Sequence, residues 1–371
     1  MDAQLNCLYV YLTDQCNLAC THCWQAAPLA GKKIFSYLNF DECENFFKNA
    51  VDMGLKRVIF SGGEPLLNPE LKKFSRFFCE NDVSVTCETN GMLISDSEIF
   101  STIKENKVYC AVSIDGATPG THNKHRGHVN AFQQTIAGIE KLDREGIHYQ
   151  LIMAVSNFNY HELIPLLDLV KKKFKHCDTF KINVVIAVGR AQRMEKKGLL
   201  FKPEDLVQMT EDVALLLDKY PFNIILHIDP AFFSFKNLLK RYSCGGNCGF
   251  KSSLSVLANG NISICSLGKQ FPDFVFGNVT DADLENVWNS NPVLTELHTN
   301  THTKLKGICA NCIFRKKCFG GCRAEALCVY GDFFGPSPRC QTFYDAGLFP
   351  RERLINAQLQ CDEDSVNHGE F

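Results

Sequence analysis

The sequence predicts an α/β fold in which parallel strands alternate with helices, followed by a smaller cysteine-rich region with a β-hairpin. Apolar, β-branched runs alternate with amphipathic segments six times over roughly the first half of the chain. The chain has nineteen cysteines, and many of them lie in the segment from Cys244 to Cys340. At 371 residues, the chain is long enough for about two domains. Alternation of this kind indicates a parallel sheet, either open or closed into a partial barrel, whose ligands bind at the carboxyl ends of the strands.

The strands and helices can be placed in order along the chain. Asn39 is expected to cap the first helix and Gly54 to end it. The expected strands span residues 8–12, 57–61, 83–87, 108–114, 149–155 and 180–187. The expected helices span residues 40–51, 69–80, 96–106, 131–145 and 161–173. A further helix over 206–217 and a strand over 223–228 follow.

A β-hairpin is expected in the C-terminal region. Residues 253–258 and 261–264 alternate in hydrophobicity with a period of two on either side of Asn259-Gly260. An Asn-Gly pair favours a type I′ turn, in which both central residues have positive φ. The hairpin is expected to return Cys265 toward Cys248.

Composition excludes several classes of protein. The net charge of −2 gives no electrostatic reason to expect nucleic acid or an anionic membrane as a partner. No apolar run approaches the ~18 residues needed to cross a bilayer, and the N-terminus lacks a secretory signal pattern. The protein is therefore expected in the cytoplasm, where disulfides are rare. Its nineteen cysteines are then better explained by metal binding than by crosslinks.

Three of these cysteines, Cys16, Cys20 and Cys23, fall within eight residues after the first expected strand. A loop this tight can direct three thiolates at one face of an iron–sulfur cluster. A four-iron cluster then keeps one iron open for a substrate or cofactor. The alternative is a zinc site that takes His22 as its fourth ligand.

This CxxxCxxC spacing, with Trp24 after the last cysteine, resembles the signature of the radical S-adenosylmethionine (radical SAM) enzymes. The resemblance implies a partial (β/α)6 barrel, here assigned to residues 1–220. It also implies that the open iron binds S-adenosylmethionine (SAM). Reductive cleavage of SAM then yields a 5′-deoxyadenosyl radical, which takes hydrogen from the substrate.

Further segments after successive strands carry the same resemblance. Gly62 and Gly63 allow close backbone approach to a ligand and Pro65 fixes the direction of the chain, although an ordinary turn would use the same residues. The resemblance implies contacts of this motif with the methionine amino group, of Arg126 with the carboxylate, and of Gly189 with adenine. The alternative is that Arg126 is a solvated surface charge. The expected SAM-binding residues are Gly62, Gly63, Glu64, Pro65, Thr89, Ser113, Asp115, Arg126 and Gly189.

Two residues near the strand at 223–228, His227 and Asp229, are candidates to face a substrate in a catalytic role. The alternative is that His227 is a core residue, because a single histidine in an apolar strand is usually buried.

The C-terminal cysteines resemble the SPASM extension of radical SAM maturases, assigned here to residues 221–371. The spacing alone leaves zinc open. The resemblance implies two auxiliary [4Fe–4S] clusters, which with the SAM-binding cluster make three. The first would use Cys248, Cys265 and Cys322, with Cys244 as its expected fourth ligand. The second would use Cys309, Cys312, Cys318 and Cys340. Cys328, which lies near this block, has no assigned role.

The resemblance implies radical modification of a ribosomally made peptide or protein by crosslinking, epimerisation or oxidation, with a flavodoxin or ferredoxin as electron donor. Sulfatase maturation and side-chain remodelling of a tetrapyrrole are alternatives. A non-catalytic iron–sulfur scaffold is a further alternative, against which the intact Cys16, Cys20 and Cys23 and the GGEP segment argue. Because the barrel is entered within about ten residues, a preceding peptide-recognition domain is not expected.

Overall fold

The computed structural model describes residues 4–27, 36–238 and 248–355. The chain divides into two compact units. The first comprises residues 1–200, 217–225 and 249–298, and the second comprises residues 201–216, 226–248 and 299–371. Each unit is formed by segments that are distant in the sequence. The sequence analysis placed a boundary between two consecutive domains at residue 220. That boundary is not the division into these two units, and it stays a prediction.

The first unit is organised around a sheet whose strand order is β10-β9-β8-β1-β2-β3-β4-β5-β6-β7. Strands β1 to β6 pair in parallel, as does β8 with β1, whereas β9 is antiparallel to β8 and to β10. The mixed α/β fold with a parallel sheet is therefore confirmed. The strands are β1 (Cys7–Thr13), β2 (Arg57–Gly62), β3 (Ser84–Thr89), β4 (Tyr109–Ser113), β5 (Tyr149–Val155), β6 (Cys177–Val184), β7 (Asn223–His227), β8 (Ser253–Val256), β9 (Asn261–Ser263) and β10 (Val275–Asn278).

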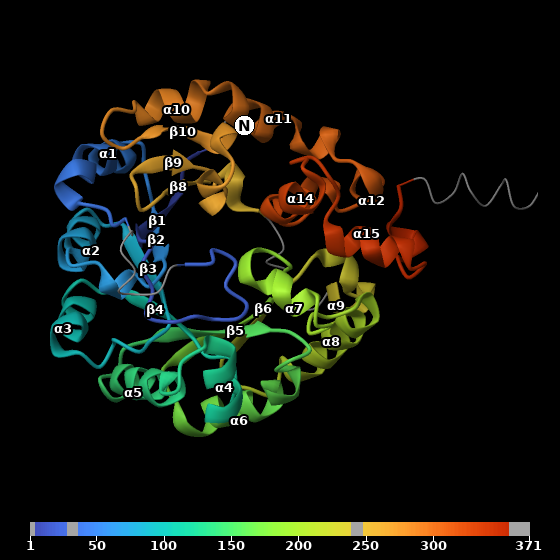
Figure 1. Ribbon diagram of the computed structural model, residues 1–371, viewed down its shortest axis with the longest axis horizontal. Helices are drawn as coiled ribbons and strands as arrows, with labels where there is room; N and C mark the ends of the chain where they lie inside the picture. The colour runs from blue at the N-terminus through green and yellow to red at the C-terminus, as the bar shows by residue number, and fades with distance from the viewer. Residues whose placement is uncertain (1–3, 28–35, 239–247, 356–371) are drawn as a thin grey trace, which may run out of the picture. The chain divides into compact units, whose positions relative to one another are not determined.

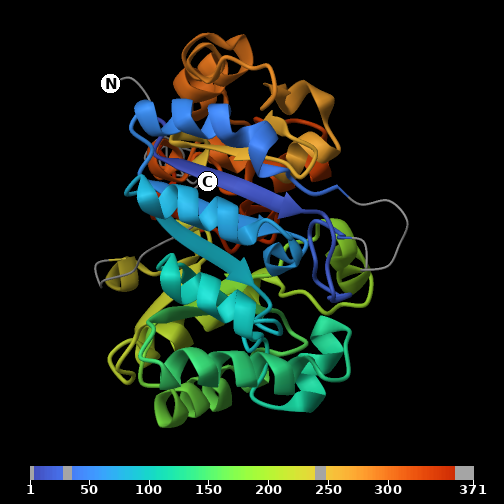
Figure 2. The ribbon, with the colours of Figure 1, turned by 90° about the vertical axis from the view of Figure 1, so that its left-hand side faces the viewer.

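Helices cover one face of this sheet, as Figure 1 shows for α1, α2, α3, α5 and α6. Figure 2 shows that the first strands point the same way, so that the loop after β1 lies at their carboxyl ends. The helices of this unit are α1 (Phe40–Asp52), α2 (Leu71–Glu80), α3 (Ser97–Glu105), α4 (Pro119–Arg126), α5 (Ala131–Arg144), α6 (Leu163–Lys173), α7 (Gln192–Glu195), α10 (Leu284–Ser290) and α11 (Pro292–Lys304), the last of which runs into the second unit.

The start and end of α1 follow from local chemistry. The Asn39 side chain accepts a hydrogen bond from the Glu42 amide at 3.3 Å, which satisfies one of the free amides of the first turn. After the helix, Gly54 adopts φ +89°, a conformation that side chains with a Cβ rarely adopt. Both expectations for this helix are confirmed.

Phenylalanines form the packing layer between the sheet and the helices α1 and α2. Phe78 has no exposed surface and contacts Phe47 on α1 and Phe60 on β2 at ring-centroid distances of 5.0 and 6.1 Å. Phe74 lies one turn earlier on the same helix and packs edge-on against Phe47. This layer holds the first two helices against the strands that carry the candidate site.

The opposite face of the sheet is more polar. Side chains alternate along a strand, so the residues between the buried apolar positions of β2, β3, β5 and β6 face away from the helices. Ser61 donates a hydrogen bond to Glu88 on this face at 3.1 Å. Gln150 of β5 and Lys181 of β6 lie on the same face, two residues out of register with each other, and are partly exposed. A polar inner face of this kind can hold a ligand with polar groups.

The helix α4 was missed by the sequence analysis. Its residues, Pro-Gly-Thr-His-Asn-Lys-His-Arg, carry no apolar stripe, so hydrophobic periodicity could not reveal it. Its buried side chains, His122, His125 and Arg126, are instead stabilised by a network of polar and charged contacts. The expected strands and helices begin and end close to the residues predicted for them, and β5 occupies the predicted residues. The strand β6 begins three residues earlier than expected.

The type I′ turn expected at Asn259-Gly260 is wrong. Only Gly260 has a positive φ, +81°, and its amide donates to the Leu257 carbonyl at 2.8 Å. Asn278, from the unexpected strand β10, donates to the Asn259 carbonyl at 3.1 Å and thereby stabilises the longer loop. The hairpin itself, β8 and β9, is confirmed.

The second unit contains short helices around a cysteine-lined centre. Its helices are α8 (Pro203–Leu216), α9 (Phe235–Leu238), α12 (Gly307–Ala310), α13 (Arg315–Cys318), α14 (Arg323–Tyr330) and α15 (Pro338–Asp345). Phe232 stacks on Phe343 of α15 at 4.7 Å. Thr210 of α8 donates a hydrogen bond to the Phe232 carbonyl at 3.0 Å, which joins these segments.

Within the described residues, no helix is both long and apolar enough to span a bilayer.

Replacing Phe78 with alanine should lower the free energy of unfolding by about 3–5 kcal/mol, because it leaves a cavity in the aromatic layer. Phe77→Ala is the matched control, since Phe77 is the neighbouring residue and is only partly buried. Urea unfolding followed by circular dichroism measures both. Equal losses in the two variants would contradict the role assigned to this layer.

Candidate active site and cysteine sites

The loop after β1 brings Cys16, Cys20 and Cys23 together. Cys16 and Cys20 are buried and pack with Leu18, while the partly buried Cys23 lies against the same cluster. The Leu18 amide donates to the Cys16 sulfur at 3.4 Å. Burial raises the pKa of the Cys16 thiol to about 12. Thiols in such an environment are stabilised as thiolates only when a cation is bound beside them.

Four glycines from three separate segments approach the backbone of this loop so closely that a side chain would not fit. A Cβ at Gly62 would lie 2.3 Å from the Thr13 carbonyl oxygen, and one at Gly63 would lie 2.1 Å from the Gln15 carbonyl oxygen. A Cβ at Gly127 would lie 2.6 Å from the Ala19 carbonyl oxygen. At Gly189 it would lie 2.3 Å from the Trp24 carbonyl oxygen. The glycines of the GGEP segment are therefore required by the cysteine loop itself.

Arg190 follows Gly189 directly, and the sequence analysis assigned no role to its side chain. Its amide donates to the Cys23 carbonyl at 2.9 Å, and its side chain donates to the carbonyls of Cys20 and Ala27 at 2.7 and 2.9 Å. One arginine thus holds both sides of the loop. Its position directly after Gly189, at the end of a strand, was the available signal.

Glu64 links the ends of β2 and β3. Its carboxylate accepts hydrogen bonds from the Leu66 amide at 3.2 Å, from the Thr89 hydroxyl at 2.6 Å and from the Asn90 amide at 2.8 Å. Asn90 in turn donates to Asn17, beside Cys16, at 2.7 Å. Burial raises the pKa of Glu64 to about 7, against the lowering effect of these hydrogen bonds. The side chain of Glu64 is therefore committed to internal contacts.

Arg126 is buried, with 8% of its surface exposed, so the alternative that it is a solvated surface charge is wrong. Its Nε lies 2.6 Å from Oδ2 of the fully buried Asp115, and its Nη1 donates to the Cys20 sulfur at 3.8 Å. Burial by itself would raise the pKa of Asp115, but the guanidinium holds it below its usual range. The contact with Cys20 places a positive charge beside a thiol, where it favours the thiolate.

Histidines surround the same carboxylate. His22 stacks on His125 with ring centroids 4.1 Å apart, and their Nε2 atoms lie 3.8 and 3.9 Å from Asp115 Oδ2. The Asp115 amide donates to His122 Nδ1 at 3.1 Å. Burial lowers the pKa of His122 to about 3 and also lowers the pKa of His22 and His125. Arg126 is therefore the stable positive charge of this group.

The remaining predicted SAM-binding residues lie at strand ends. Pro65 starts a short 3₁₀ helix after β2, and Thr89 and Ser113 are the last residues of β3 and β4. Gly189 begins a 3₁₀ turn after β6. Because parallel strands end at one edge of the sheet, all these residues lie on the side of the cysteine loop.

The spacing of the thiols distinguishes between the two kinds of metal site. A single zinc ion bound at about 2.3 Å would bring its thiolates to within about 4 Å of one another. Among the described residues, only His22, Asp115 and His125 bring three metal-binding atoms within 4.8 Å of one another, and no set of three cysteines does so. In a four-iron cluster each thiolate binds a different iron, so its thiolates stand farther apart. The donor sets fit an iron–sulfur cluster better than zinc.

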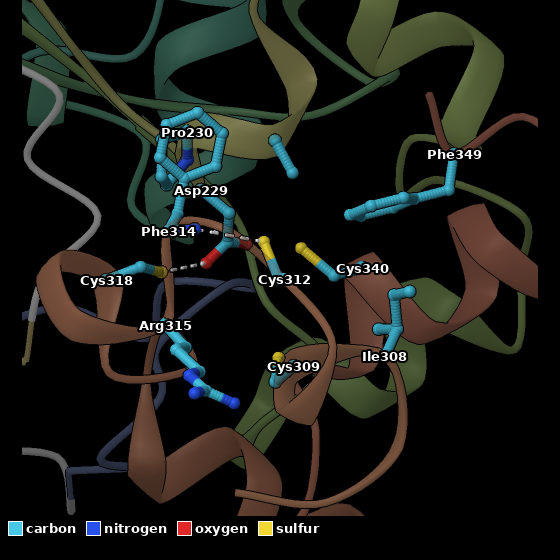
Figure 3. A pocket seen from close by; sticks show the side chains of 12 residues that line it. Asp229, Pro230, Ile308, Cys309, Cys312, Phe314, Arg315, Cys318, Cys340 and Phe349 are labelled. Carbon is cyan, nitrogen blue, oxygen red and sulfur yellow. Dashed lines mark hydrogen bonds between the residues drawn. The ribbon is translucent and has the colours of Figure 1, made fainter. Parts of the chain in front are cut away.

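In the second unit, Cys309, Cys312, Cys318 and Cys340 line one pocket. Figure 3 shows their sulfur atoms around a common space, with Asp229 between them. The Cys309 sulfur accepts a hydrogen bond from the Ser337 amide at 3.3 Å, and the Cys312 sulfur accepts one from the Phe314 amide at 3.4 Å. All four are free of disulfides. We call this group the four-cysteine cage.

Buried arginines surround the cage. Arg323, with 1% of its surface exposed, donates to the carbonyls of Phe333 and Gly335 at 2.9 and 2.6 Å. Arg353, with 3% exposed, donates to the Ala231 carbonyl. Although burial raises the pKa of Cys309 to about 11, the charge of Arg323 acts in the opposite direction. Fixed positive charges suit a cavity that is to hold four thiolates.

The structure describes three of the four cysteines predicted for the other auxiliary cluster. Cys322, at the start of α14, lies near enough to Cys248 for the two thiols to interact electrostatically, and burial raises its pKa to about 12. Cys265 follows the hairpin in the first unit. Cys244 lies outside the described residues. Cys328 is a partly buried residue of α14.

The two catalytic candidates differ in their surroundings. His227 is a partly buried residue at the end of β7. Asp229 is fully buried and lines the four-cysteine cage.

Gly189→Ala should lower the iron bound by the cysteine loop, because the new Cβ would collide with the Trp24 carbonyl. Gly198→Ala is the matched control. Gly198 has a similar φ of +65°, against +62°, but no atom lies within 4 Å of its Cβ position. Iron and sulfide assays after anaerobic reconstitution compare the two. If both variants lose the same amount of iron, backbone strain and not the loop contact is responsible.

Glu64→Gln should change how stability depends on pH. The folded protein binds the Glu64 proton more tightly than the unfolded chain, so this group's contribution is full below about pH 4.5 and is lost as pH rises to about 7. Wild type should therefore lose up to about 3 kcal/mol relative to the variant between pH 5 and pH 8. Urea unfolding at both pH values tests this, and parallel pH profiles would contradict it.

Comparison with known proteins agrees with this geometry. The Radical SAM superfamily profile matches residues 10–170, and the profile of the SPASM iron–sulfur cluster-binding domain matches residues 244–313. These two domains imply the use of SAM and of iron–sulfur clusters.

Individual proteins resemble the chain over most of its length. An AdoMet-dependent heme synthase of Methanosarcina barkeri is 28% identical, over 89% of this chain and 94% of its own. The mycofactocin maturase MftC of Mycobacterium ulcerans is 25% identical, over 95% of this chain and 92% of its own. The crystal structure of Streptococcus suis SuiB bound to S-adenosylmethionine superposes with a TM-score of 0.72 at 18% identity. It covers 91% of this chain and 78% of that one, and it supports the fold. The chain therefore carries a radical SAM domain at residues 10–170 and a C-terminal SPASM domain at residues 244–313.

Proposed function

We propose that Cys16, Cys20 and Cys23 hold a [4Fe–4S] cluster whose fourth iron binds SAM. The arrangement of the loop carries this proposal: Cys16 and Cys20 are buried in one cluster, Cys23 packs against it, and the Arg126 guanidinium lies beside Cys20. With SAM bound, such a cluster supplies a 5′-deoxyadenosyl radical that removes a hydrogen atom from a substrate.

The protein groups around this loop would bind and orient SAM. Because the side chain of Glu64 is occupied by Leu66, Thr89 and Asn90, the contact proposed for the GGEP segment with the methionine amino group is made by its backbone. The Arg126 guanidinium already pairs with Asp115 through Nε, so its proposed contact with the SAM carboxylate uses its other nitrogens. Ser113, the last residue of β4, is proposed to lie near the ribose or the methionine portion of SAM, and Gly189, after β6, is proposed to approach the adenine through its backbone.

The C-terminal cysteines are proposed to hold two further [4Fe–4S] clusters. The four-cysteine cage supplies one complete set of four thiolates. Cys248, Cys265 and Cys322 are proposed to bind the other, with Cys244 as fourth ligand. Clusters ligated fully by protein have no open iron, so they would accept or pass on an electron from an oxidised substrate radical. A flavodoxin- or ferredoxin-type donor in the cytoplasm would reduce the SAM-binding cluster.

As substrate we propose a ribosomally made peptide or protein that undergoes crosslinking, epimerisation or oxidation. The similarity to the mycofactocin maturase, which extends over nearly the whole of both chains, supports this class. A peptide presents amide and side-chain polar groups, and the inner face of the sheet carries Glu88, Gln150 and Lys181 to meet them.

A second candidate is side-chain remodelling of a tetrapyrrole. The similarity to the heme synthase of Methanosarcina barkeri supports it, since that protein has the higher identity of the two relatives described above. The carboxylates of such a substrate would also find a cation on the inner face, at Lys181.

Cys23→Ala should abolish formation of 5′-deoxyadenosine and remove about one third of the bound iron. Three four-iron clusters hold about twelve irons, and only one of them depends on this thiol. Iron assay and chromatography of the reaction with dithionite and SAM measure both quantities. Cys79→Ala is a suitable control, because Cys79 is a partly buried cysteine of α2 outside every proposed ligand set. Wild-type cleavage of SAM by the Cys23 variant would contradict the assignment, and zinc in the C-terminal sites would contradict the auxiliary clusters.

The two substrate classes can be separated by testing which substrate is consumed. Incubation with iron coproporphyrin III, or with each short peptide encoded beside the gene, should show SAM-dependent consumption of one of them with stoichiometric 5′-deoxyadenosine. Mass spectrometry follows the product. Loss of carboxyl groups from the porphyrin would refute the peptide proposal, whereas a mass change in the peptide would refute the tetrapyrrole proposal.

A further inference from the structure

A buried carboxylate lies inside the four-cysteine cage. Asp229 has no exposed surface and lines the same cavity as Cys309, Cys312, Cys318 and Cys340. Its Oδ1 lies 3.9 Å from the Cys318 sulfur. Figure 3 shows the carboxylate turned toward the sulfur atoms. A negative charge at this position lies beside groups that are themselves negative when they bind metal, which is costly unless it serves a purpose.

The position of this carboxylate is fixed from several sides. Ser337 donates a hydrogen bond to Asp229 Oδ2 at 3.2 Å, and the Arg339 Nη2 lies 3.1 Å from the same oxygen. A Cβ at Gly321 would lie 2.2 Å from Asp229 Oδ1, so the residue at 321 must be glycine for the carboxylate to stay where it is. Gly321 also has φ +71°, a second reason for glycine here.

The charge of Asp229 is paired with that of Arg339. The Nε of Arg339 also lies 3.8 Å from Glu325. Both carboxylates are buried, Asp229 at 0% and Glu325 at 3% exposed. The pair of Asp229 and Arg339 acts as a dipole whose negative end faces the cage. Electrostatic interactions are strong at such a site because water is excluded from it.

We propose that Asp229 and Arg339 together set the reduction potential of the cluster held by the four-cysteine cage. Charges and hydrogen bonds near the ligands of a metal cluster are among the main determinants of its potential. The carboxylate beside Cys318 disfavours an added electron, and the guanidinium behind it limits this effect. Asp229 is in this view a tuning residue and not a catalytic one. The inference rests on the proposed function to the extent that the cage must hold an iron–sulfur cluster.

A purely structural role for Asp229 is the competing explanation. Ser337 both donates to Asp229 and caps α15 through the Cys340 amide, so the carboxylate could simply anchor this helix. The two explanations differ in what they predict for the potential. If Asp229 only anchors α15, replacing it has no systematic effect on the reduction potential of the cluster. If its charge tunes the cluster, removing that charge shifts the reduction potential in a direction set by the sign of the charge.

The experiment is an anaerobic redox titration of the full-length protein, followed by electron paramagnetic resonance. A Cys16→Ala, Cys20→Ala, Cys23→Ala background removes the SAM-binding cluster, so that only the auxiliary clusters contribute to the signal. Asp229→Asn should move the midpoint potential of the cage cluster upward, and Arg339→Gln should move it downward. Arg339→Lys, which keeps the charge, should stay near the wild-type value.

Two controls separate charge from structure. Asp345→Asn makes the same charge change at an exposed position of α15 and should leave the potential unchanged. Ser337→Ala removes the hydrogen bond to Asp229 without changing a charge, and it should shift the potential less than Asp229→Asn does.

Each outcome decides the question. Opposite shifts in the Asp229 and Arg339 variants support the inference. Variants that load the cluster but keep the wild-type potential overturn it in favour of the structural anchor. If Asp229→Asn fails to bind iron, the downward shift in Arg339→Gln becomes the deciding measurement, and its absence overturns the inference. Wild-type protein with zinc or no metal in the cage would instead overturn the cluster assignment in the proposed function.

Discussion

The cysteine loop depends on direct backbone contact between segments that are far apart in the sequence. Gly62, Gly63, Gly127 and Gly189 each occupy a position where a Cβ would lie within about 2.1–2.6 Å of a carbonyl oxygen of residues 13–24. Arg190 completes this support by donating to three carbonyls of the same loop. Because these groups come from the ends of β2 and β6 and from the end of α4, the loop takes its shape only when the sheet has formed. Three thiols within eight residues would otherwise have no fixed direction.

Both cysteine sites are accompanied by buried positive charge. Arg126 lies beside Cys20 in the first unit, and the buried Arg323 and Arg353 and the partly buried Arg339 lie near the four-cysteine cage in the second. A buried guanidinium is unfavourable unless it meets an anion, and thiolates bound to a metal provide that anion. Each site also includes a carboxylate, Asp115 or Asp229, that pairs with one of these arginines. The two sites thus share one electrostatic design, in which the charge near the sulfur atoms is adjusted by an arginine–aspartate pair.

The sites differ in how many protein ligands they offer, and this difference has chemical consequences. The loop supplies three thiols, so a four-iron cluster held there would keep one iron for the outside ligand that cleavage of SAM requires. The cage supplies four thiols, which suits transfer of electrons without binding of substrate. An enzyme that removes a hydrogen atom and then an electron from its substrate needs both kinds of site. The fold provides the first at the carboxyl ends of parallel strands and the second among short helices.

The sequence by itself determined the alternation of strands and helices, the cap at Asn39, and the grouping of the cysteines, because these depend on local periodicity, hydrogen bonding and spacing. It could not reveal α4, whose polar residues are stabilised by Asp115 and by one another, nor could it show that Arg126 is buried. It placed Glu64 and the two glycines before it at a ligand, which stays a prediction, and the tertiary structure adds that these residues support the cysteine loop and β3. The role of Arg190 and the place of Asp229 within the cage were decided only by the tertiary structure. Both arise from contacts between residues more than 80 positions apart, and no local pattern records such contacts.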